Sequence, residues 1–277
     1  MTDVQSSWSE QYSALVQRNV GFITAEQQER LRNARVAVLG VGGVGGSAFE
    51  VLVRSGIERF SIVDCDRFDA TNMNRQVFAT QDTLGELKVD VAARWALSVN
   101  QEVRVQTFER VGEDNIGDIL DDADVVVMGI DSLLPCLIAS RKAREMRIPA
   151  VEGWAIPFGN VRVFTGETPT LEEAYDLPTV GKPLSDLSDR DVAELQLKVL
   201  MSLGQIEGVA DYYTEETLEK IRQGHIVSFA PTVRLTAILL ALEAIKVLLD
   251  WGKLSLSPHF AVYDPFMQRI PSKTPQR

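Results

Sequence analysis

The residues best suited to chemistry begin where the apolar run VAVLG, from Val36, leads into the glycines of GVGGVGG. Gly40, Gly42 and Gly45 have the G-x-G-x-x-G spacing of a dinucleotide-binding turn. Such a turn needs glycine because its backbone angles are unusual and phosphates approach the backbone closely. The helix that follows would point free N–H groups at a phosphate. The pattern predicts a nucleotide site; a glycine turn used only for helix–sheet packing is the alternative.

The residues downstream of this turn favour ATP over NAD. Asp64, 24 residues after Gly40, ends the second expected strand, where a carboxylate can accept hydrogen bonds from ribose hydroxyls. A polar cluster that an NAD site does not need then follows: Asn72, Arg75, Gln76 and Lys88. An arginine fork and a lysine point charge suit a triphosphate that must release pyrophosphate. Asp131 ends another expected strand at the same sheet edge, where a carboxylate is a natural Mg²⁺ ligand.

Alternating strands and helices must position these side chains. Apolar or alternating runs predict strands at 35–40, 59–66, 102–109, 124–131, 148–155 and 259–264. Helical patterns are expected at 42–54, 84–100, 114–123, 137–147, 190–203, 214–224 and 231–250. Thr24 is the expected N-cap of an N-terminal helix, and Gly224 is expected to close the helix that begins at Thr214. The alternation predicts βαβ units on a parallel sheet.

The chain is expected to form one domain with four parts. They are an N-terminal helical arm at 1–34, a nucleotide-binding core at 35–165, an excursion on the substrate side at 166–227, and a closing helix and strand at 228–277. The acidic, proline-containing stretch 166–190 is expected to frame the substrate site. The apolar helix at 231–250 is expected to pack in the core or at a dimer interface.

Composition narrows the function classes. A net charge of −11 makes a nucleic-acid-binding surface unlikely, because phosphate contacts need clustered lysine and arginine. With two cysteines and no CxxC, neither a disulfide framework nor a cysteine zinc site is supported, and Cys65 and Cys136 are expected in the core. His225 and His259 are expected to be structural or solvated. Without a signal peptide or membrane span in the pattern, a cytoplasmic protein is expected.

Five motifs in register resemble the ThiF/MoeB/HesA family, the bacterial relatives of ubiquitin-activating enzymes. They are GVGGVGG, DCD with Asp64, NMNRQ, GELK with Lys88 and GID with Asp131, all within residues 10–165. The match returns at 228–270 in SFAPTVRLTAILLALEAIKVLL and AVYDPF. The resemblance implies a Rossmann-like, doubly wound, mainly parallel α/β sheet with an added C-terminal mixed-sheet portion. It also implies an adenylyltransferase that uses ATP and Mg²⁺ to convert a carboxylate into an acyl adenylate, releasing pyrophosphate.

The resemblance assigns a role to each matched residue. The nucleotide would be bound by the glycine loop and by acidic, amide and hydroxyl side chains: Gly40, Gly42, Gly43, Gly45, Asp64, Asp66, Asn72, Gln76 and Ser132. Asp64 would hold the ribose, and Ser132 could instead cap the next helix. Arg75 and Lys88 would clamp the phosphates together with Asn72. Asp131 would hold Mg²⁺ at the reacting phosphate. Arg18 would act from the neighbouring subunit, although the family's usual R-[YF]-x-R-Q is absent.

Two departures from the family affect the interpretation. Many members carry two CxxC pairs for a structural zinc, and this chain has none, so no zinc is expected. No cysteine follows Cys136, so the activated acyl group would leave as the adenylate. The family's usual substrate is the C-terminus of a ubiquitin-like or sulfur-carrier protein, but the absent cysteines weaken that hypothesis. They favour a small carboxylate, a peptide C-terminus or a modified tRNA base as the substrate. A homodimer is expected from the family. A catalytically idle binding subunit and an NAD(P)-dependent oxidoreductase are the competing hypotheses.

Overall fold

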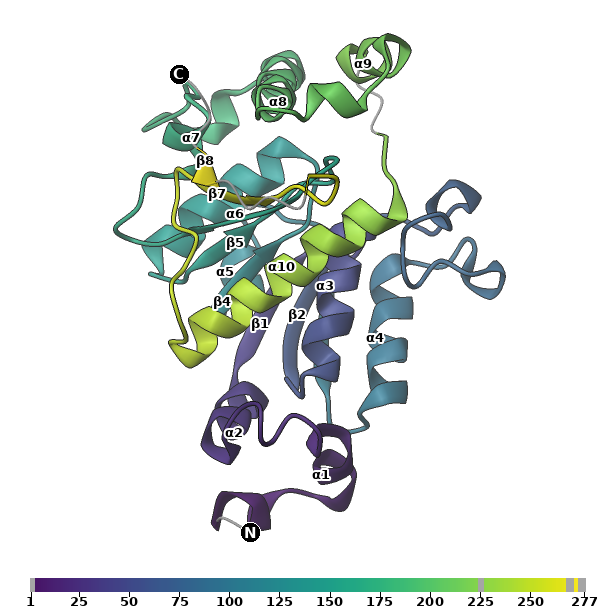
Figure 1. The fold of residues 1–277 in the computed structure, drawn as a ribbon. Coiled ribbons are helices and arrows are strands. Elements are labelled where there is room, and N and C mark those ends of the chain that lie inside the picture. Colours follow the sequence, from purple (N-terminus) through teal and green to yellow (C-terminus); the bar gives the residue numbers. More distant parts are fainter. Residues whose placement is uncertain (1–2, 224–226, 268–271, 274–277) are drawn as a thin grey trace.

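A central β-sheet organises the chain, of which the computed structural model describes residues 3–223, 227–267 and 272–273 (Figure 1). Within these residues the sheet has eight strands, in the order β3-β2-β1-β4-β5-β6-β7-β8. They are β1 (Arg35–Leu39), β2 (Arg59–Val63), β3 (Arg104–Phe108), β4 (Val125–Met128), β5 (Ala150–Glu152), β6 (Gly159–Phe164), β7 (Phe260–Tyr263) and β8 (Ser272–Lys273).

The strand pairing changes once across the sheet, from parallel to antiparallel. The strands β3-β2-β1-β4-β5 pair in parallel, and β6, β7 and β8 continue the sheet with antiparallel pairings. The predicted α/β class, with a parallel core and a mixed C-terminal portion, is therefore confirmed. The strand order reverses between β1 and β4, and in open α/β sheets ligands bind at the carboxyl ends of the strands at such a point.

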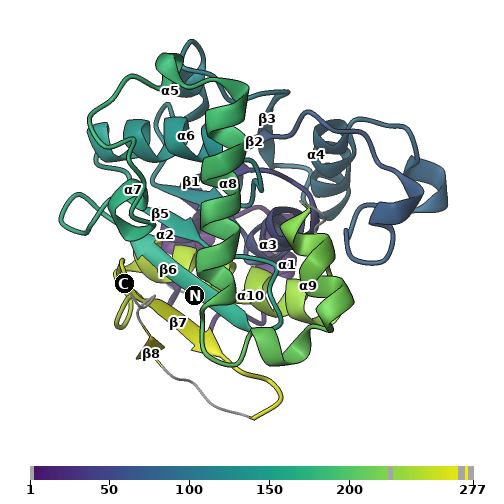
Figure 2. The same ribbon diagram turned by 90° about the horizontal axis from the view of Figure 1, so that it is seen from above.

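Helices cover both faces of the sheet (Figures 1 and 2). The helices are α1 (Glu10–Val16), α2 (Ala25–Asn33), α3 (Gly43–Arg54), α4 (Lys88–Val99), α5 (Ile116–Ile119), α6 (Leu133–Glu145), α7 (Leu171–Ala174), α8 (Asp189–Gly204), α9 (Glu215–Arg222) and α10 (Ala230–Leu249). Side chains alternate along each strand, so Val36 and Val38 pack with α3, α4 and α10, while Ala37 and Leu39 pack with α5, α6 and α8.

The helix α10 packs in the core, which is one of the two positions expected for it. Its buried face carries Val233, Ala237, Leu240, Ala241 and Ala244, and it crosses α3 and β6. The opposite face exposes about half of the Ile238 and Leu242 side chains. Although α10 has twenty residues, no helix among the described residues is long and apolar enough to span a membrane.

The N-terminal arm lies at the amino ends of the parallel strands (Figure 1). Thr24 caps α2 as predicted, in a capping box with Gln27. A single residue, Ala34, separates α2 from β1. The arm therefore sits at the end of the sheet opposite the glycine loop, which follows the carboxyl end of β1.

Several predicted boundaries were wrong by a few residues. The strand expected at 59–66 ends at Val63, because the next residues turn out of the sheet around the side chain of Asp64. The strand expected at 148–155 is only Ala150–Glu152. The strand β6 was missed, although NVRVF has the alternation typical of a strand. Thr214 caps α9 as predicted, whereas Gly224 and His225 lie outside the described residues.

Close packing of glycines fixes the turn between β1 and α3. Gly40 has a φ of +86°, which favours glycine. A Cβ atom at Gly45 would lie 1.9 Å from the carbonyl oxygen of Gly40 and 3.3 Å from the Cα atom of Gly129. The first turn of α3 therefore touches the backbone at the ends of both β1 and β4, as the third glycine of the fingerprint allows.

Replacing Gly45 with alanine is expected to lower the free energy of unfolding by about 2 kcal/mol or more, because backbone atoms must move to make room. Chemical denaturation monitored by circular dichroism measures this change. The matched control is Gly117→Ala in α5, where a Cβ atom would have no neighbour within 4 Å. That variant should keep or slightly raise the stability, since alanine favours helix. Equal stabilities for the two variants would contradict the packing argument.

Candidate nucleotide-binding site

A cavity of about 550 Å³ opens at the carboxyl ends of the parallel strands. Each parallel strand contributes lining residues from the loop that follows it. Across the sheet edge these are residues 109–111 after β3, 64–66 after β2, the glycine loop after β1, 129–132 after β4 and 153–156 after β5. The cavity therefore spans the switch point, where this fold class binds ligands.

The structure brings most of the predicted site residues together on this cavity. The lining includes Gly40, Gly42, Gly43, Asp64, Asp66, Arg75, Gln76, Lys88, Asp131 and Ser132. Three predicted residues are not part of the lining. Gly45 packs beneath the turn, Asn72 accepts a hydrogen bond from the backbone N–H of Asp69 at 3.2 Å, and Arg18 follows α1 at the other end of the sheet.

The Asp64 carboxylate accepts hydrogen bonds from the backbone of two loops, the glycine loop and its own. Its Oδ2 accepts the N–H of Val41 at 2.9 Å, and its Oδ1 accepts the N–H of Asp66 at 3.0 Å. Burial raises the pKa of the Asp64 carboxyl above its ordinary value, while the nearby Lys88 ammonium opposes that rise. These bonds fix the orientation of the carboxylate relative to the glycine loop.

Lys88 supplies a buried positive charge beside this carboxylate. It is the first residue of α4, and only 5% of its surface is exposed. Its Nζ lies 2.8 Å from Oδ2 of Asp66 and 3.9 Å from Oδ1 of Asp64. A buried ammonium needs such a counterion. The two carboxylates therefore hold the lysine charge at the wall of the cavity.

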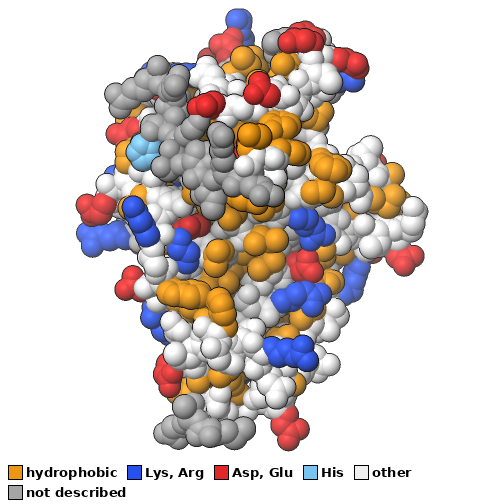
Figure 3. All heavy atoms as spheres, viewed as in Figure 1, with side chains coloured by type: hydrophobic (Ala, Val, Ile, Leu, Met, Phe, Trp, Pro, Cys, Tyr) orange, Lys and Arg blue, Asp and Glu red, His pale blue; other side chains and the backbone are white. Residues whose placement is uncertain are grey.

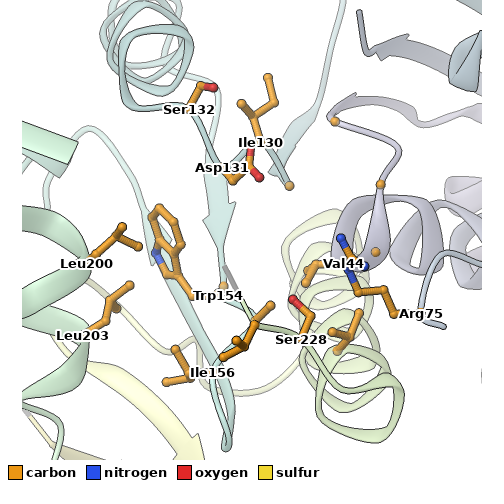
Figure 4. Close-up of a pocket in the computed structure, with 18 of the residues that line it drawn as sticks. Val44, Arg75, Ile130, Asp131, Ser132, Trp154, Ile156, Leu200, Leu203 and Ser228 are labelled. Carbon is orange, nitrogen blue, oxygen red and sulfur yellow. The ribbon is translucent and has the colours of Figure 1, made fainter. Parts of the chain in front are cut away.

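Arg75 and Gln76 lie against the glycines. The aliphatic part of Arg75 lies beside the glycine turn (Figure 4), 3.6 Å from where a Cβ atom of Gly43 would be. The Nη1 of Arg75 donates to the carbonyl of Thr71 at 2.9 Å. The Oε1 of Gln76 is buried without a hydrogen-bond partner. A buried carbonyl oxygen without a partner is costly, so it indicates a place for a ligand donor. The open glycine turn and this oxygen fit a bound nucleotide.

Asp131 and Ser132 lie across the cavity from Arg75 (Figure 4). Both are exposed, and they follow β4 by three and four residues. Ser132 occupies the N-cap position of α6, yet its side chain makes no capping hydrogen bond. Carboxylate and hydroxyl oxygens are hard ligands of the kind Mg²⁺ prefers, so Asp131 fits a Mg²⁺ ligand on chemical grounds.

The sequence profile of the ThiF family matches residues 16–277. The chain belongs to the ThiF family. Among curated relatives it is 38% identical to the tRNA threonylcarbamoyladenosine dehydratase of Bacillus subtilis over 43% of this chain and 51% of that protein. It is 36% identical to the sulfur carrier protein adenylyltransferase of Thermus thermophilus, covering 53% of this chain and 54% of that protein. The chain thus spans about half the length of these two relatives.

Relatives of similar length and known structure extend this match to the ThiF fold. The molybdopterin-synthase adenylyltransferase of Haemophilus influenzae is 26% identical over 92% of this chain and 90% of that protein. The solved structure of Escherichia coli MccB with ATP has a TM-score of 0.66 and 21% identity, covering 97% of this chain and 74% of that one. Escherichia coli TcdA with AMP has a TM-score of 0.63 and 21% identity, covering 87% and 97%.

The two cysteines of this ThiF-family chain differ in environment. Cys136 is buried in the core as predicted, and burial raises the pKa of its thiol well above the usual range. The core placement predicted for Cys65 is wrong, because Cys65 is exposed and lines the cavity. That prediction assumed strand alternation, but β2 ends at Val63, two residues earlier.

The wall opposite the glycine loop was not predicted from the ThiF motifs. Trp154 and Ile156 follow β5, and Leu200 and Leu203 lie on α8, with all four beside the cavity (Figure 4). No described lining residue comes from 166–190, which was expected to frame the site. The signal that could have identified this wall is the apolar sequence VLMSL near the end of α8, which has apolar residues on more than one helix face.

The stretch 166–190 instead contacts this wall on the side away from the cavity, through Tyr175. Tyr175 accepts a hydrogen bond from Nε1 of Trp154 at 2.7 Å and lies 3.2 Å from the carboxylate of Glu152. Burial raises the pKa of the Tyr175 phenol well above 10, so the phenol stays neutral and donates to Glu152. Arg162, fully buried under three aromatic rings, binds Glu152 through Nε at 2.6 Å. The orientation of Trp154 therefore depends on this buried network.

Replacing Glu152 with glutamine is expected to lower the free energy of unfolding by about 3–5 kcal/mol, because Arg162 would keep a buried charge without its counterion. Urea denaturation measures the loss. The double variant Glu152→Gln with Arg162→Met should recover most of it, since no buried charge remains. As a control, Asp114→Asn breaks an exposed pair with Arg110 and should leave the midpoint unchanged. A double variant no more stable than Glu152→Gln would contradict this account.

Proposed function

We propose that this ThiF-family protein is an ATP-dependent adenylyltransferase that converts a carboxylate into an acyl adenylate with release of pyrophosphate. The observation that carries the proposal is the convergence of the glycine turn, Asp64, Arg75, Lys88 and Asp131 on one cavity. Its relatives include enzymes named as adenylyltransferases, and its structural relatives include MccB solved with ATP.

The proposed reaction needs positioning and charge neutralisation. A carboxylate oxygen attacks the α-phosphorus of ATP, the bond from that phosphorus to the bridging oxygen of the β-phosphate breaks, and pyrophosphate leaves. The carboxylate is already ionised at neutral pH, so no general base is required. Because the nucleophile and the polyphosphate are both anionic, groups that neutralise charge and fix geometry carry the catalysis.

The residues divide these tasks. Asp64 would hold the ribose, with Asp66 beside it, and the N-terminus of α3 would face the phosphates. Arg75 and Lys88 would clamp the phosphates, and Asn72 and Gln76 would support that clamp. Asp131 would hold Mg²⁺, which supplies further neutralisation of the phosphate charge, and Ser132 would contact the nucleotide.

Two competing functions are less well supported by the cavity. An NAD(P)-dependent oxidoreductase would use the glycines and Asp64 but would give Lys88, Arg75 and Asp131 no role. An idle binding subunit would be expected to lack some of these charged groups, whereas Arg75, Lys88 and Asp131 all line the cavity. Since no cysteine follows Cys136, the acyl group would pass directly from the adenylate to an acceptor.

Calorimetric titration with ATP–Mg²⁺ and, separately, with NAD⁺ tests the nucleotide. Binding of NAD⁺ alone would overturn the proposal in favour of the oxidoreductase.

Lys88→Ala is expected to reduce carboxylate-dependent ATP–pyrophosphate exchange by at least about 100-fold, because it removes a preorganised positive charge. The control Lys142→Ala removes a lysine paired with Glu145 on α6, away from the cavity, and should retain exchange. Full exchange in Lys88→Ala would show that this lysine does not hold the phosphates.

We also propose a symmetric homodimer in which Arg18 completes the partner's site. Arg18 follows α1, at the end of the sheet opposite the glycine loop of its own subunit. It could therefore reach only the cavity of the partner subunit. The exposed apolar face of α10, with Ile238 and Leu242, offers a surface for a second copy (Figure 3). Phe22, 81% exposed, adds to it through its edge contact with Trp251.

Arg18→Ala and Lys88→Ala are each expected to lose exchange, and co-expression of the two is expected to restore it. Half of the dimers would then be mixed, and each mixed dimer would hold one intact site, giving about a quarter of the wild-type exchange rate. Exchange assays on the co-expressed, purified mixture measure this. Restoration would fail if Arg18 acted within its own subunit, and an active Arg18→Ala protein would show that Arg18 has no role.

A further inference from the structure

The two ends of the cavity differ in chemistry. The end formed by β3, β2 and β1 carries the charged residues Asp64, Asp66, Lys88, Glu109 and Arg110. At the other end, beyond Asp131, none of the described lining residues is charged. We call this second end the apolar chamber, and its main walls are Trp154, Ile156, Leu200 and Leu203.

The apolar chamber is built from segments far apart in the sequence. Trp154 and Ile156 come from the loop after β5, and Leu200 and Leu203 face them from α8 (Figure 4). Leu218 and Ile221, on α9, also line the cavity. The polar exceptions include Gln205, Ser228 and Tyr213, and burial raises the pKa of the Tyr213 phenol to about 12, so that it is neutral.

The order of the loops along the sheet edge shows which part of the substrate this chamber would face. If Asp64 holds the ribose, the phosphates lie over the N-terminus of α3, between the ends of β2 and β4. The carboxylate must approach the α-phosphorus from the side away from the leaving pyrophosphate. If Arg75 and Lys88 clamp the leaving phosphates, that side lies toward Asp131, where the cavity continues to Trp154. The group attached to the carboxylate would therefore extend into the apolar chamber.

We propose that the acid activated here carries an apolar group, branched aliphatic or aromatic, within a few bonds of its carboxylate. This inference rests on the proposed adenylyltransferase function. A charged group would lose its hydration there without gaining a partner, and a glycine terminus would leave the apolar walls without a contact. Trp154 is the specificity-determining residue, because its hydrogen bond to Tyr175 and the network behind it fix the position of its ring.

Stable mimics of the acyl adenylate test this preference by calorimetry. In one arm, 5′-sulfamoyladenosine carries a 4-methylpentanoyl, acetyl or succinyl group. In the other arm it carries N-acetyl-leucyl or N-acetyl-glycyl, which mimic a peptide C-terminus. We expect the branched apolar member of at least one arm to bind about 10-fold tighter than its small or charged counterpart. Preference in the first arm alone would indicate a small acid, and preference in the second a peptide terminus.

Equal binding of all acyl groups, or tightest binding of the succinyl compound, would overturn the inference while leaving the proposed function intact. If sulfamoyladenosine and every acyl form failed to bind, the proposed function would fail and this inference with it.

A pair of leucine variants on α8 locates the preference. Leu200→Asn places an amide in the apolar chamber and is expected to reduce the preference for 4-methylpentanoyl over acetyl at least about 5-fold. Its binding of unsubstituted sulfamoyladenosine should not change. The control Leu197→Asn alters an exposed residue outside the lining, one turn earlier, and should keep the preference. Trp154→Ala provides a second test from the opposite wall. An unchanged preference in both cavity variants would overturn the assignment.

Discussion

The rest of the site depends on the close contact of three glycines at the switch point of the sheet. Gly40 directly follows β1, Gly45 lies in the first turn of α3, and Gly129 directly follows β4. A Cβ atom at Gly129 would lie 2.6 Å from the Cα atom of Gly45, and one at Gly40 would lie 2.6 Å from the carbonyl oxygen of Gly129. The three backbones therefore touch without side chains between them. This contact sets the position of the α3 N-terminus relative to the loop that carries Asp131, so a single packing constraint fixes a helix N-terminus and a carboxylate beside the same cavity.

The charged end of the cavity is organised before any ligand arrives. Burying the Lys88 ammonium alone would cost free energy, and burial alone raises the pKa of the Asp64 carboxyl. Because the two charges are opposite and close together, each lowers the free-energy cost of burying the other. Hydrogen bonds from Val41 and Asp66 then hold the Asp64 carboxylate at the end of β2. A preorganised arrangement of this kind does not have to reorient during a reaction, which is the main source of electrostatic catalysis.

Most residues that meet at the charged end could be identified from the sequence, whereas the apolar end was missed, for a physical reason. Phosphate binding uses glycines and charged residues close together in the sequence, so GVGGVGG and Lys88 could be recognised as local motifs. The apolar chamber joins Trp154, after β5, to Leu200 on α8, and the sequence does not show that these two distant segments face the same cavity. The apolar residues on more than one face of α8 were a local sign of this wall only. Cys65 illustrates a second limit, since its predicted burial depended on a strand that ends two residues too soon. Gly129 and the Arg162–Glu152 pair were also missed, because their importance appears only when distant strands pair.

The division of the cavity has a chemical consequence for an adenylating enzyme. An acyl adenylate is readily hydrolysed, and closing a site with apolar side chains keeps water from the reactive carbonyl. The same walls that would select an apolar acyl group would thus protect the intermediate after pyrophosphate leaves. In this chain the apolar residues of α8, with Trp154 opposite them, would form that protecting wall. The apolar chamber would then serve both to choose the acid and to hold its adenylate until an acceptor arrives.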